Sequence, residues 1–277
     1  MPKPIFWEQV MKKILFIGTA ITVFILFFII FYILKNGLAV VDLEFLLSSP
    51  KDLGRAGGIF PCIVGTIVLT LVAIIIAAPL GVGTAIYLRE YTRESRLTSM
   101  IRFGTDCLAG IPSIIFGLFG FVLFVVYLGM GWSILSGGMT MAFMILPTII
   151  RTAEEAIKSV PDSYREVSLS LGGTKWQTIV KVVLPSALPG IVTGIILGVA
   201  RSIEETAVVI FTAGSVLRIP TSLFDSCRTM SVHFYILARE GISMENAYGT
   251  AAILIITILL INMFAYWLMH RLMAKYS

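Results

Sequence analysis

The sequence has few charged residues and very few residues that bind metals. Charged side chains make up 13% of its 277 residues, whereas hydrophobic side chains make up 57%. A chain this poor in charge cannot cover a soluble surface, so we expect an integral membrane protein. Its net charge of +5 is too thinly spread to form a basic docking face. This argues against a nucleic-acid partner and assigns the excess to membrane orientation or to an anionic substrate.

Motifs for metal binding, catalysis and ATP hydrolysis are missing as well. Cys62, Cys107 and Cys227 form no CxxC pair, and two histidines alone cannot make a metal cluster. No HExxH, GxSxG or GxxxxGK[ST] segment occurs. We therefore expect no cofactor, no metal, no catalytic residue and no ATPase in this chain. The sequence leaves open whether Cys62 and Cys227 form a disulfide.

Long apolar segments are what the sequence has instead. Segments able to cross about 30 Å of hydrocarbon predict an all-α, polytopic membrane protein with about six transmembrane helices in one membrane domain. The expected spans are residues 14–34, 59–88, 108–127, 132–150, 188–211 and 247–269. The fourth contains Pro147. Neighbouring helices would have to satisfy the backbone groups that this proline leaves without a hydrogen bond.

Lysine and arginine are unevenly divided between the two sides of the expected membrane. If the amino terminus is cytoplasmic, the inner segments hold fourteen of these residues and the outer segments six. The positive-inside rule therefore predicts that both termini lie in the cytoplasm. Two connecting segments are long enough to carry function, 151–187 inside and 212–246 outside.

The inner segment contains two helix signals separated by glycine. Residues 163–166 and 174–177 each have the capping-box pattern, and Gly172-Gly173 predicts a turn between the two helices. Leu184-Pro185 predicts the end of the second helix. The loop would present apolar side chains suited to a groove in a partner protein, namely Leu169, Leu171, Trp176 and Ile179. A helix pair resting on the membrane surface is the alternative.

This loop resembles the coupling motif of ABC-importer permeases, Glu-Ala-Ala, three residues, Gly, nine residues, Ile-x-Leu-Pro. Here the motif is Glu166-Val167-Ser168, Gly172 and Val182-Val183-Leu184-Pro185. Both intervals are kept, with Val-Ser in place of Ala-Ala and Val182 in place of isoleucine. The resemblance implies that the loop docks in a groove of a separate ATPase, and that its coupling residues are Glu166, Gly172, Trp176, Leu184 and Pro185.

The fifth span contains the charged segment Arg201-Ser-Ile-Glu204-Glu205-Thr206. Arg201 lies about 20 Å along the helix from Leu188, at 1.5 Å per residue. Ionisable groups at such a depth are costly, and they mark a substrate path or a structural ion pair. Glu204 and Glu205 follow Arg201 by three and four residues, so either can pair with it on one helix face. A pair that only fixes helix packing is the alternative.

The charged segment resembles the Arg-x-x-Gly-Glu-Thr-Ala sequence of Pst-type phosphate importer permeases, except that Glu204 stands where that family has glycine. Residues 220–225 and 233–238 resemble the external loop of the A-type subunit, and 147–152 resembles its entry into the coupling loop. The likeness covers about residues 75–277. It implies an inner-membrane permease that works with a homologous C-type permease, two ATP-binding subunits and an extracytoplasmic phosphate-binding protein.

Phosphate suits these residue types. A guanidinium offers a planar fork of donors to phosphate oxygens, and a carboxylate accepts the proton of HPO4, which sulfate lacks. The resemblance implies a substrate path of Arg201, Glu205 and Thr206, with Arg151 as a second site at the inner end. An anchoring role at the cytoplasmic surface is the other reading of Arg151. Our hypothesis for Glu204 is an ion pair across the interface with the second permease.

Other functions remain as alternatives. The coupling motif alone would allow an ABC permease for sulfate, molybdate or phosphonate. A secondary transporter or channel would use the charged helix to move protons, and its inner loop would dock nothing. A membrane enzyme is the third alternative, and the motifs offer it no nucleophile, base and orienting group.

Overall fold

The protein is almost entirely helical in the computed structural model, which describes residues 3–92 and 95–276. The long helices are α1 (Lys3–Gly37), α3 (Phe60–Ile86), α6 (Ile134–Lys158), α9 (Leu184–Glu204) and α12 (Met244–Tyr276). The shorter helices are α2 (Leu43–Leu47), α4 (Arg96–Ala109), α5 (Ser113–Gly120), α7 (Asp162–Ser170), α8 (Lys175–Thr178), α10 (Ala207–Thr212) and α11 (Met230–Arg239). Wider π-helical turns are η2 (Tyr87–Tyr91), η3 (Phe121–Tyr127) and η4 (Ile179–Val183). A 3₁₀ turn, η1 (Asp52–Gly54), separates the antiparallel strands β1 (Pro50–Lys51) and β2 (Ala56–Gly57).

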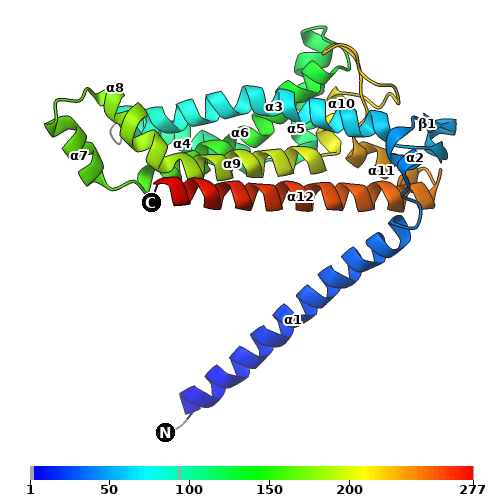
Figure 1. Cartoon of the computed structure of the whole chain (residues 1–277), viewed down its shortest axis with the longest axis horizontal. Coiled ribbons are helices and arrows are strands. Elements are labelled where there is room, and N and C mark those ends of the chain that lie inside the picture. The colour runs from blue at the N-terminus through cyan, green and yellow to red at the C-terminus, as the bar shows by residue number, and fades with distance from the viewer. Residues whose placement is uncertain (1–2, 93–94, 277) are drawn as a thin grey trace.

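The long helices other than α1 form a bundle. Figure 1 shows α3, α9 and α12 running along the long axis of the molecule, and α6 contacts both α3 and α9. The loop end of the bundle carries α7, α8 and the carboxyl end of α12, whereas the far end carries α2, β1 and α11. Helix α1 leaves the bundle at the far end, contacts α12, and extends away from the other helices.

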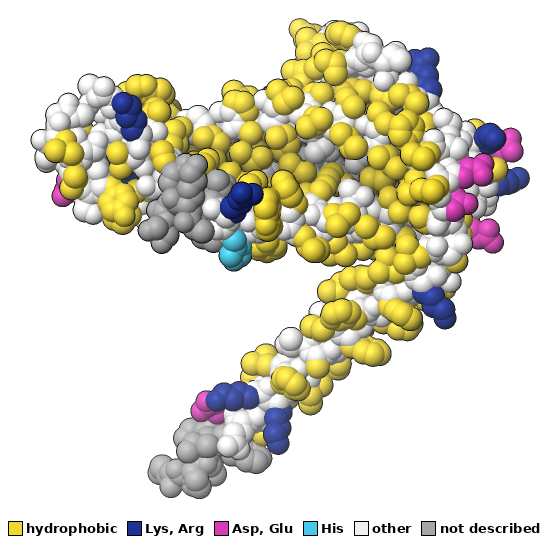
Figure 2. All heavy atoms as spheres, in the orientation of Figure 1, with side chains coloured by type: hydrophobic (Ala, Val, Ile, Leu, Met, Phe, Trp, Pro, Cys, Tyr) yellow, Lys and Arg dark blue, Asp and Glu magenta, His cyan; other side chains and the backbone are white. Residues whose placement is uncertain are grey.

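Several described helices suit a membrane. Five are long and apolar enough to cross one, and a sixth crossing is added if the bent pair of α4 and α5 counts as one span. Figure 2 shows hydrophobic side chains covering the flank of the bundle and of α1, with charged side chains gathered toward the ends. The predicted all-α architecture with about six membrane helices is therefore confirmed.

Two expected spans are not continuous helices. The span 108–127 starts at the end of α4, and the chain then turns by 101° before it continues through α5 and η3. Pro112 lies at this turn and biases the preceding residue away from the helical conformation. The span 188–211 breaks at Glu205, whose backbone is extended at φ −72° and ψ 130°. The expected fourth span is the first part of α6, which includes Pro147 and continues to Lys158.

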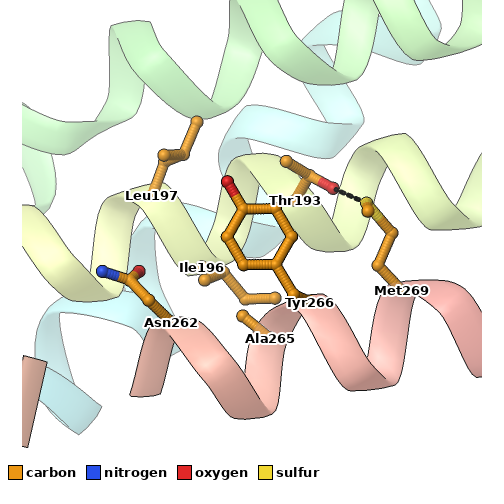
Figure 3. A pocket seen from close by; sticks show the side chains of 7 residues that line it. All are labelled: Thr193, Ile196, Leu197, Asn262, Ala265, Tyr266 and Met269. Atoms are coloured by element: carbon orange, nitrogen blue, oxygen red, sulfur yellow. Dashed lines mark hydrogen bonds between the residues drawn. The ribbon is translucent and has the colours of Figure 1, made fainter. Parts of the chain in front are cut away.

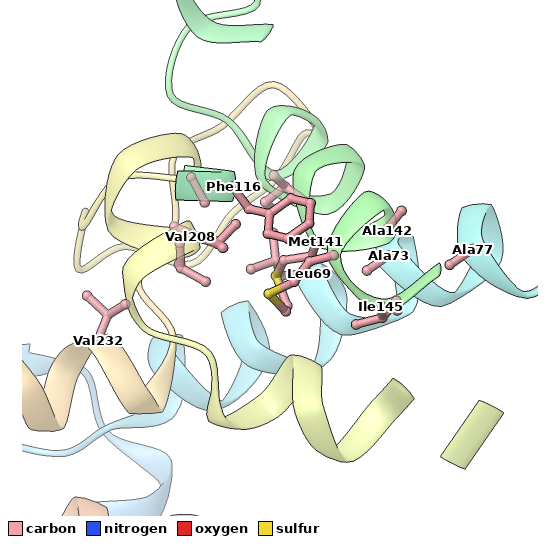
Figure 4. Close-up of a cluster of buried hydrophobic side chains, with 14 of the residues drawn as sticks. Leu69, Ala73, Ala77, Phe116, Met141, Ala142, Ile145, Val208 and Val232 are labelled. Carbon is pink, nitrogen blue, oxygen red and sulfur yellow. The ribbon is translucent and has the colours of Figure 1, made fainter. Parts of the chain in front are cut away.

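The core lies where α3, α6 and α10 meet α5 (Figure 4). Leu69, Met141, Ile145 and Val208 are buried there. Small residues allow the close approach of α3 and α6, since a Cβ at Gly138 would lie 2.4 Å from Val72 Cγ1. The helix pair is therefore tightly packed, as is usual where helices associate in lipid.

The inner loop differs in part from the sequence prediction. The capping box at 163–166 is wrong, because α7 begins at Asp162 after Pro161 and has no side-chain cap. The box at 174–177 is confirmed, with Gln177 N donating to Thr174 Oγ1 at 3.2 Å and Thr174 N donating to Gln177 Oε1 at 2.9 Å. Gly172 makes the predicted turn at φ +82°.

The predicted helix end at Leu184-Pro185 is also wrong. The chain continues from α8 through η4 into α9 as one helical segment, Lys175–Glu204. Pro185 directly follows the π-helical turn η4, whose wider hydrogen-bond pattern accommodates a residue without an N–H. Ile179 is fully buried within this segment and therefore cannot belong to an exposed docking face. Arg151, expected at the start of the loop, lies inside α6.

Candidate functional site

Arg201 and Glu204 lie on the last turn of α9, and both side chains are exposed. Within residues 3–92 and 95–276, neither side chain takes part in a hydrogen bond or ion pair. The alternative in which Arg201 pairs with a carboxylate of its own helix is therefore not seen among these residues. A guanidinium without a partner keeps its donors available for an anion that approaches from outside the chain.

Glu205 has a different environment because the helix ends just before it. Its side chain is buried, and Oε1 accepts from Ala207 N at 3.1 Å and from Val208 N at 3.4 Å. Its backbone carbonyl accepts from Ser231 Oγ at 2.7 Å. Glu205 thus supplies the first N–H groups of α10 with an acceptor and ties the break to α11.

Thr206 follows the break and lines a cavity of about 400 Å³. The cavity lies between α5, α10 and α11, and its lining is largely apolar, with Ile114, Phe211 and Phe234. Arg239 also lines it and donates from Nη1 to Tyr235 Oη at 2.6 Å. Of the predicted path residues, Thr206 is the one placed at this cavity.

A smaller cavity of about 60 Å³ lies between α9 and α12 (Figure 3). Thr193 Oγ1 lies 3.4 Å from Met269 Sδ at its edge, and Tyr266 and Asn262 complete its polar groups. The lining contains no charged side chain. A lining without a cation does not suit a dianion.

Arg151 is held apart from Arg201, on a different helix. It forms an exposed ion pair with Asp106 of α4. The neighbouring pair is Arg102 and Glu154, with 2.7 Å between Nη2 and Oε1. These four charged residues line a cavity of about 110 Å³. The sequence analysis did not predict the two partners in α4, because no local pattern indicates a contact between residues that are 45 or 52 positions apart.

The predicted coupling residues are mostly accessible at the loop end. Glu166 and Gly172 are exposed, as is Trp176, at 61% of its surface. Leu171 is 84% exposed and Leu169 is 51% exposed. Leu184 and Pro185 are half-buried at the start of α9. The groove between α7 and α8 has a volume of about 630 Å³, so the loop presents both apolar side chains and a recess.

The far end contains a buried polar group that the sequence did not single out as a site. His233 is 1% exposed, and its Nδ1 lies 3.4 Å from Arg228 Nη1. Burial and the charge of Arg228 lower the pKa of His233 to about 4. Cys62 and Cys227 are buried near Arg228, and both thiols are free.

Comparisons with known proteins agree with this architecture. The family model described as "Binding-protein-dependent transport system inner membrane component" matches residues 77–277. The chain is 32% identical to the probable ABC transporter permease protein YqgI of Bacillus subtilis, covering 86% of each chain. It is 31% identical to the phosphate transport system permease protein PstA of Pasteurella multocida, covering 93% of this chain and 92% of that protein.

Solved structures with the same fold are more distant in sequence. A bacterial ABC transporter for the import of alginate matches with a TM-score of 0.67 at 16% identity, covering 96% of this chain and 98% of that one. The inward-facing MetNI methionine ABC transporter matches with a TM-score of 0.63 at 19% identity, covering 75% and 93%.

The fold is therefore that of a type I ABC-importer permease, a transport component rather than an enzyme. The chain belongs to the family of binding-protein-dependent transport system inner membrane components. The predicted relationship to the Pst-type permeases is confirmed by relatives of that name at 31% to 38% identity.

Proposed function

We propose that this chain is the A-type permease subunit of an importer for inorganic phosphate. ATP hydrolysis on separate subunits drives transport, and an extracytoplasmic binding protein delivers the ion. The proposal rests on the guanidinium of Arg201, which is exposed and has no partner among the described residues, one turn before a break in a membrane helix. The names of the PstA relatives support phosphate as its ligand.

The substrate path consists of Arg201 and Thr206, with Glu205 holding the break that positions them. Arg201 supplies donors to phosphate oxygens, and Thr206 adds a hydroxyl at the cavity beyond the break. Glu205 accepts backbone N–H groups, so its role in the path is to fix the local geometry. Arg151 serves as the inner site, where the ion would compete with Asp106 for its guanidinium.

The path is completed by a homologous C-type permease. Because Arg201 and Glu204 are exposed on one side of α9, a second chain can cover them. Glu204 then pairs with a cation of that chain. Uptake and assembly that stay unchanged in Glu204→Gly would contradict this interface role, and Glu240→Gly is a control at an exposed far-end position.

The remaining partners meet the two ends of the bundle. Two ATP-binding subunits bind the coupling loops, with Trp176, Leu169 and Leu171 as the apolar contacts. The loop end is then cytoplasmic, and the carboxyl end of α12 lies at the same end (Figure 1). The amino end of α1 is cytoplasmic as well, in agreement with the excess of lysine and arginine in the inner segments.

The test is uptake of labelled phosphate into vesicles that contain this chain and its candidate partners. We expect uptake with internal ATP and none without it. Excess unlabelled phosphate should compete, whereas sulfate, molybdate and phosphonate should not. ATP-dependent transport that does not respond to phosphate would support the permease class and contradict phosphate as the substrate. Uptake that persists without ATP would favour a secondary transporter.

A further inference from the structure

Arg165 and Glu90 form a largely buried ion pair between the coupling loop and the inner end of α3. Arg165 lies in α7, and Glu90 lies in η2, the π-helical turn that extends α3. Their side chains are 15% and 8% exposed, and Nη2 lies 2.7 Å from Oε1. Arg165 Nε also donates to Oε1 at 3.1 Å. The pair joins segments 75 residues apart.

The remaining donors of Arg165 bind the carboxyl end of α6 and the start of α7. Nη1 donates to Val160 O at 2.8 Å and to Asp162 Oδ1 at 3.1 Å. Nη2 donates to Ile157 O at 3.1 Å. All five N–H donors of the guanidinium are therefore used. No donor is left for a substrate or for lipid, so the arginine fixes the relative positions of three helices.

The loop itself is connected internally and touches η2 a second time. Ser168 Oγ and Thr178 Oγ1 lie 2.8 Å apart, which links α7 to α8. Lys175 at the start of α8 places Nζ 5.1 Å from the ring centre of Tyr91 in η2. Both helices of the loop thus contact the same short turn, the first through a buried ion pair and the second through a cation–π contact.

Helix α3 connects this turn to the far end of the bundle. There Thr66 Oγ1 accepts from Met230 N at 2.9 Å, at the start of α11. Gly65 lies against the same segment, since a Cβ at that position would be 2.6 Å from Arg228 O. A displacement of the inner end of α3 would therefore reach the start of α11, which Ser231 connects to the break in α9, because packed helices move as stiff bodies.

We propose that the Arg165–Glu90 ion pair is the positioning contact through which a movement of the coupling loop displaces α3. The chain connects the loop backward to α6 and forward through η4 to α9, whereas α3 has no direct covalent connection to the loop and reaches it through its packing against α6 and through this contact. The ion pair would make α3 move together with the loop. This inference rests on the proposed function, because it takes the loop to be moved by a separate ATPase.

The first test measures coupling in proteoliposomes that hold the assembled transporter. The quantity is phosphate imported per ATP hydrolysed. Glu90→Gln keeps the size and an acceptor oxygen of the side chain but removes the charge. We expect the ratio to fall about tenfold, because a neutral amide oxygen holds the guanidinium more weakly than a carboxylate does, while ATP hydrolysis continues. Glu90→Asp, which keeps the carboxylate, should restore part of the ratio.

Asp162→Asn is the matched control. It changes an exposed carboxylate, 74% accessible, that binds the same guanidinium, and we expect an unchanged ratio. A wild-type ratio in Glu90→Gln would overturn the inference. If Glu90→Gln does not assemble, Arg165→Lys takes its place, because it keeps the cation and loses the fork. Failure of both to assemble would assign the pair to folding alone and also overturn the inference.

A second measurement does not depend on the substrate. Spin labels at Tyr87 in η2 and at Met263 in α12, both exposed, report the position of the inner end of α3; Cys107, the exposed native thiol, is first replaced by Ser. In wild type we expect ATP binding to change the distance, and in Glu90→Gln the change should be lost. An equal change in both would refute the ion pair as the link. Wild type that moves but imports no phosphate would refute only the proposed substrate.

Discussion

Two arginines, Arg165 and Arg201, show how the same side chain is used in opposite ways. Arg165 is 15% exposed and has every donor bound, with Glu90 as its main partner. Arg201 is exposed and has no hydrogen-bond or ion-pair partner within residues 3–92 and 95–276. The first therefore determines how helices are placed, whereas the second is free to meet an ion or a second subunit.

The difference follows from the cost of burying charge. A guanidinium removed from water is tolerated only when its donors are bound, so the buried Arg165 has a complete set of acceptors. Arg201 would be costly in lipid without a partner, so we expect its side chain to face a water-filled path or another chain.

Removing the carboxylate of the buried pair should cost the most stability. Glu90→Ala leaves the Arg165 cation without its main partner, and we expect a loss of about 3 kcal/mol in the free energy of unfolding. Thermal unfolding of the purified protein in detergent measures it. Arg102→Gln is the control, because that pair is more exposed, at 40% for Arg102, and should cost less. Equal losses would remove the distinction between buried and exposed pairs.

Arg201→Gln should affect transport and leave stability unchanged. A lost charged hydrogen bond to the ion corresponds to about 2 kcal/mol, or about thirtyfold in phosphate uptake. The unfolding temperature should match wild type, because no described contact within the chain depends on this side chain. A large drop in that temperature would mean that Arg201 has a structural partner, and the comparison with Arg165 would fail.

His233, the neutral partner of Arg228, should make the free energy of unfolding depend on pH. Because the pKa of His233 is lowered to about 4 in the folded protein, the unfolded chain binds more protons between that value and about 6.5. The stability that the neutral imidazole contributes is thus complete above about pH 6.5. It falls by about 1.4 kcal/mol per pH unit as the pH is lowered from there to about 4. His233→Gln should remove this dependence, as followed by unfolding temperature at pH 7 and 5.5. The control His270→Gln, at an exposed position, should keep it.

The smallest expected effect concerns the turn that shapes the coupling loop. Gly172 has φ +82° and open space around its Cβ position, so Gly172→Ala adds backbone strain without a clash. We expect a cost of about 1 kcal/mol. Gly104→Ala, with open space and no positive φ, should cost nothing. Hydrogen exchange of α7 and α8 would measure the first variant and that of α4 the second. Wild-type protection of α7 and α8 in Gly172→Ala would contradict the strain.

Much of the architecture followed from sequence patterns. The apolar segments predicted the membrane helices, because a span must bury its whole length in hydrocarbon. The second capping box and the turn at Gly172 were also correct, since both depend on local backbone chemistry. The first capping box failed because Pro161 already places the chain for the start of α7. The end predicted at Pro185 failed because a preceding π-helical turn lets the helix continue.

Less of the candidate site could be predicted from the sequence. Spacing alone placed Arg201 and Glu205 on one helix face, but the helix ends at Glu204, and Glu205 binds the backbone of α10 instead. The motif drew attention to Glu166, while the buried contact belongs to the residue before it. Nothing in the pattern around Glu90 indicated a partner in the loop, because that contact spans 75 residues.

The sequence by itself determined the membrane class, the helical architecture and the family motifs of the coupling loop and of the Arg201 segment. Hydrophobic length and local spacing are properties of the chain alone, so they do not depend on how its segments pack. The tertiary structure alone decided which arginine is bound and which is open. That outcome depends on how α3, α6 and α7 converge at the loop end, and on the break that turns Glu205 away from Arg201.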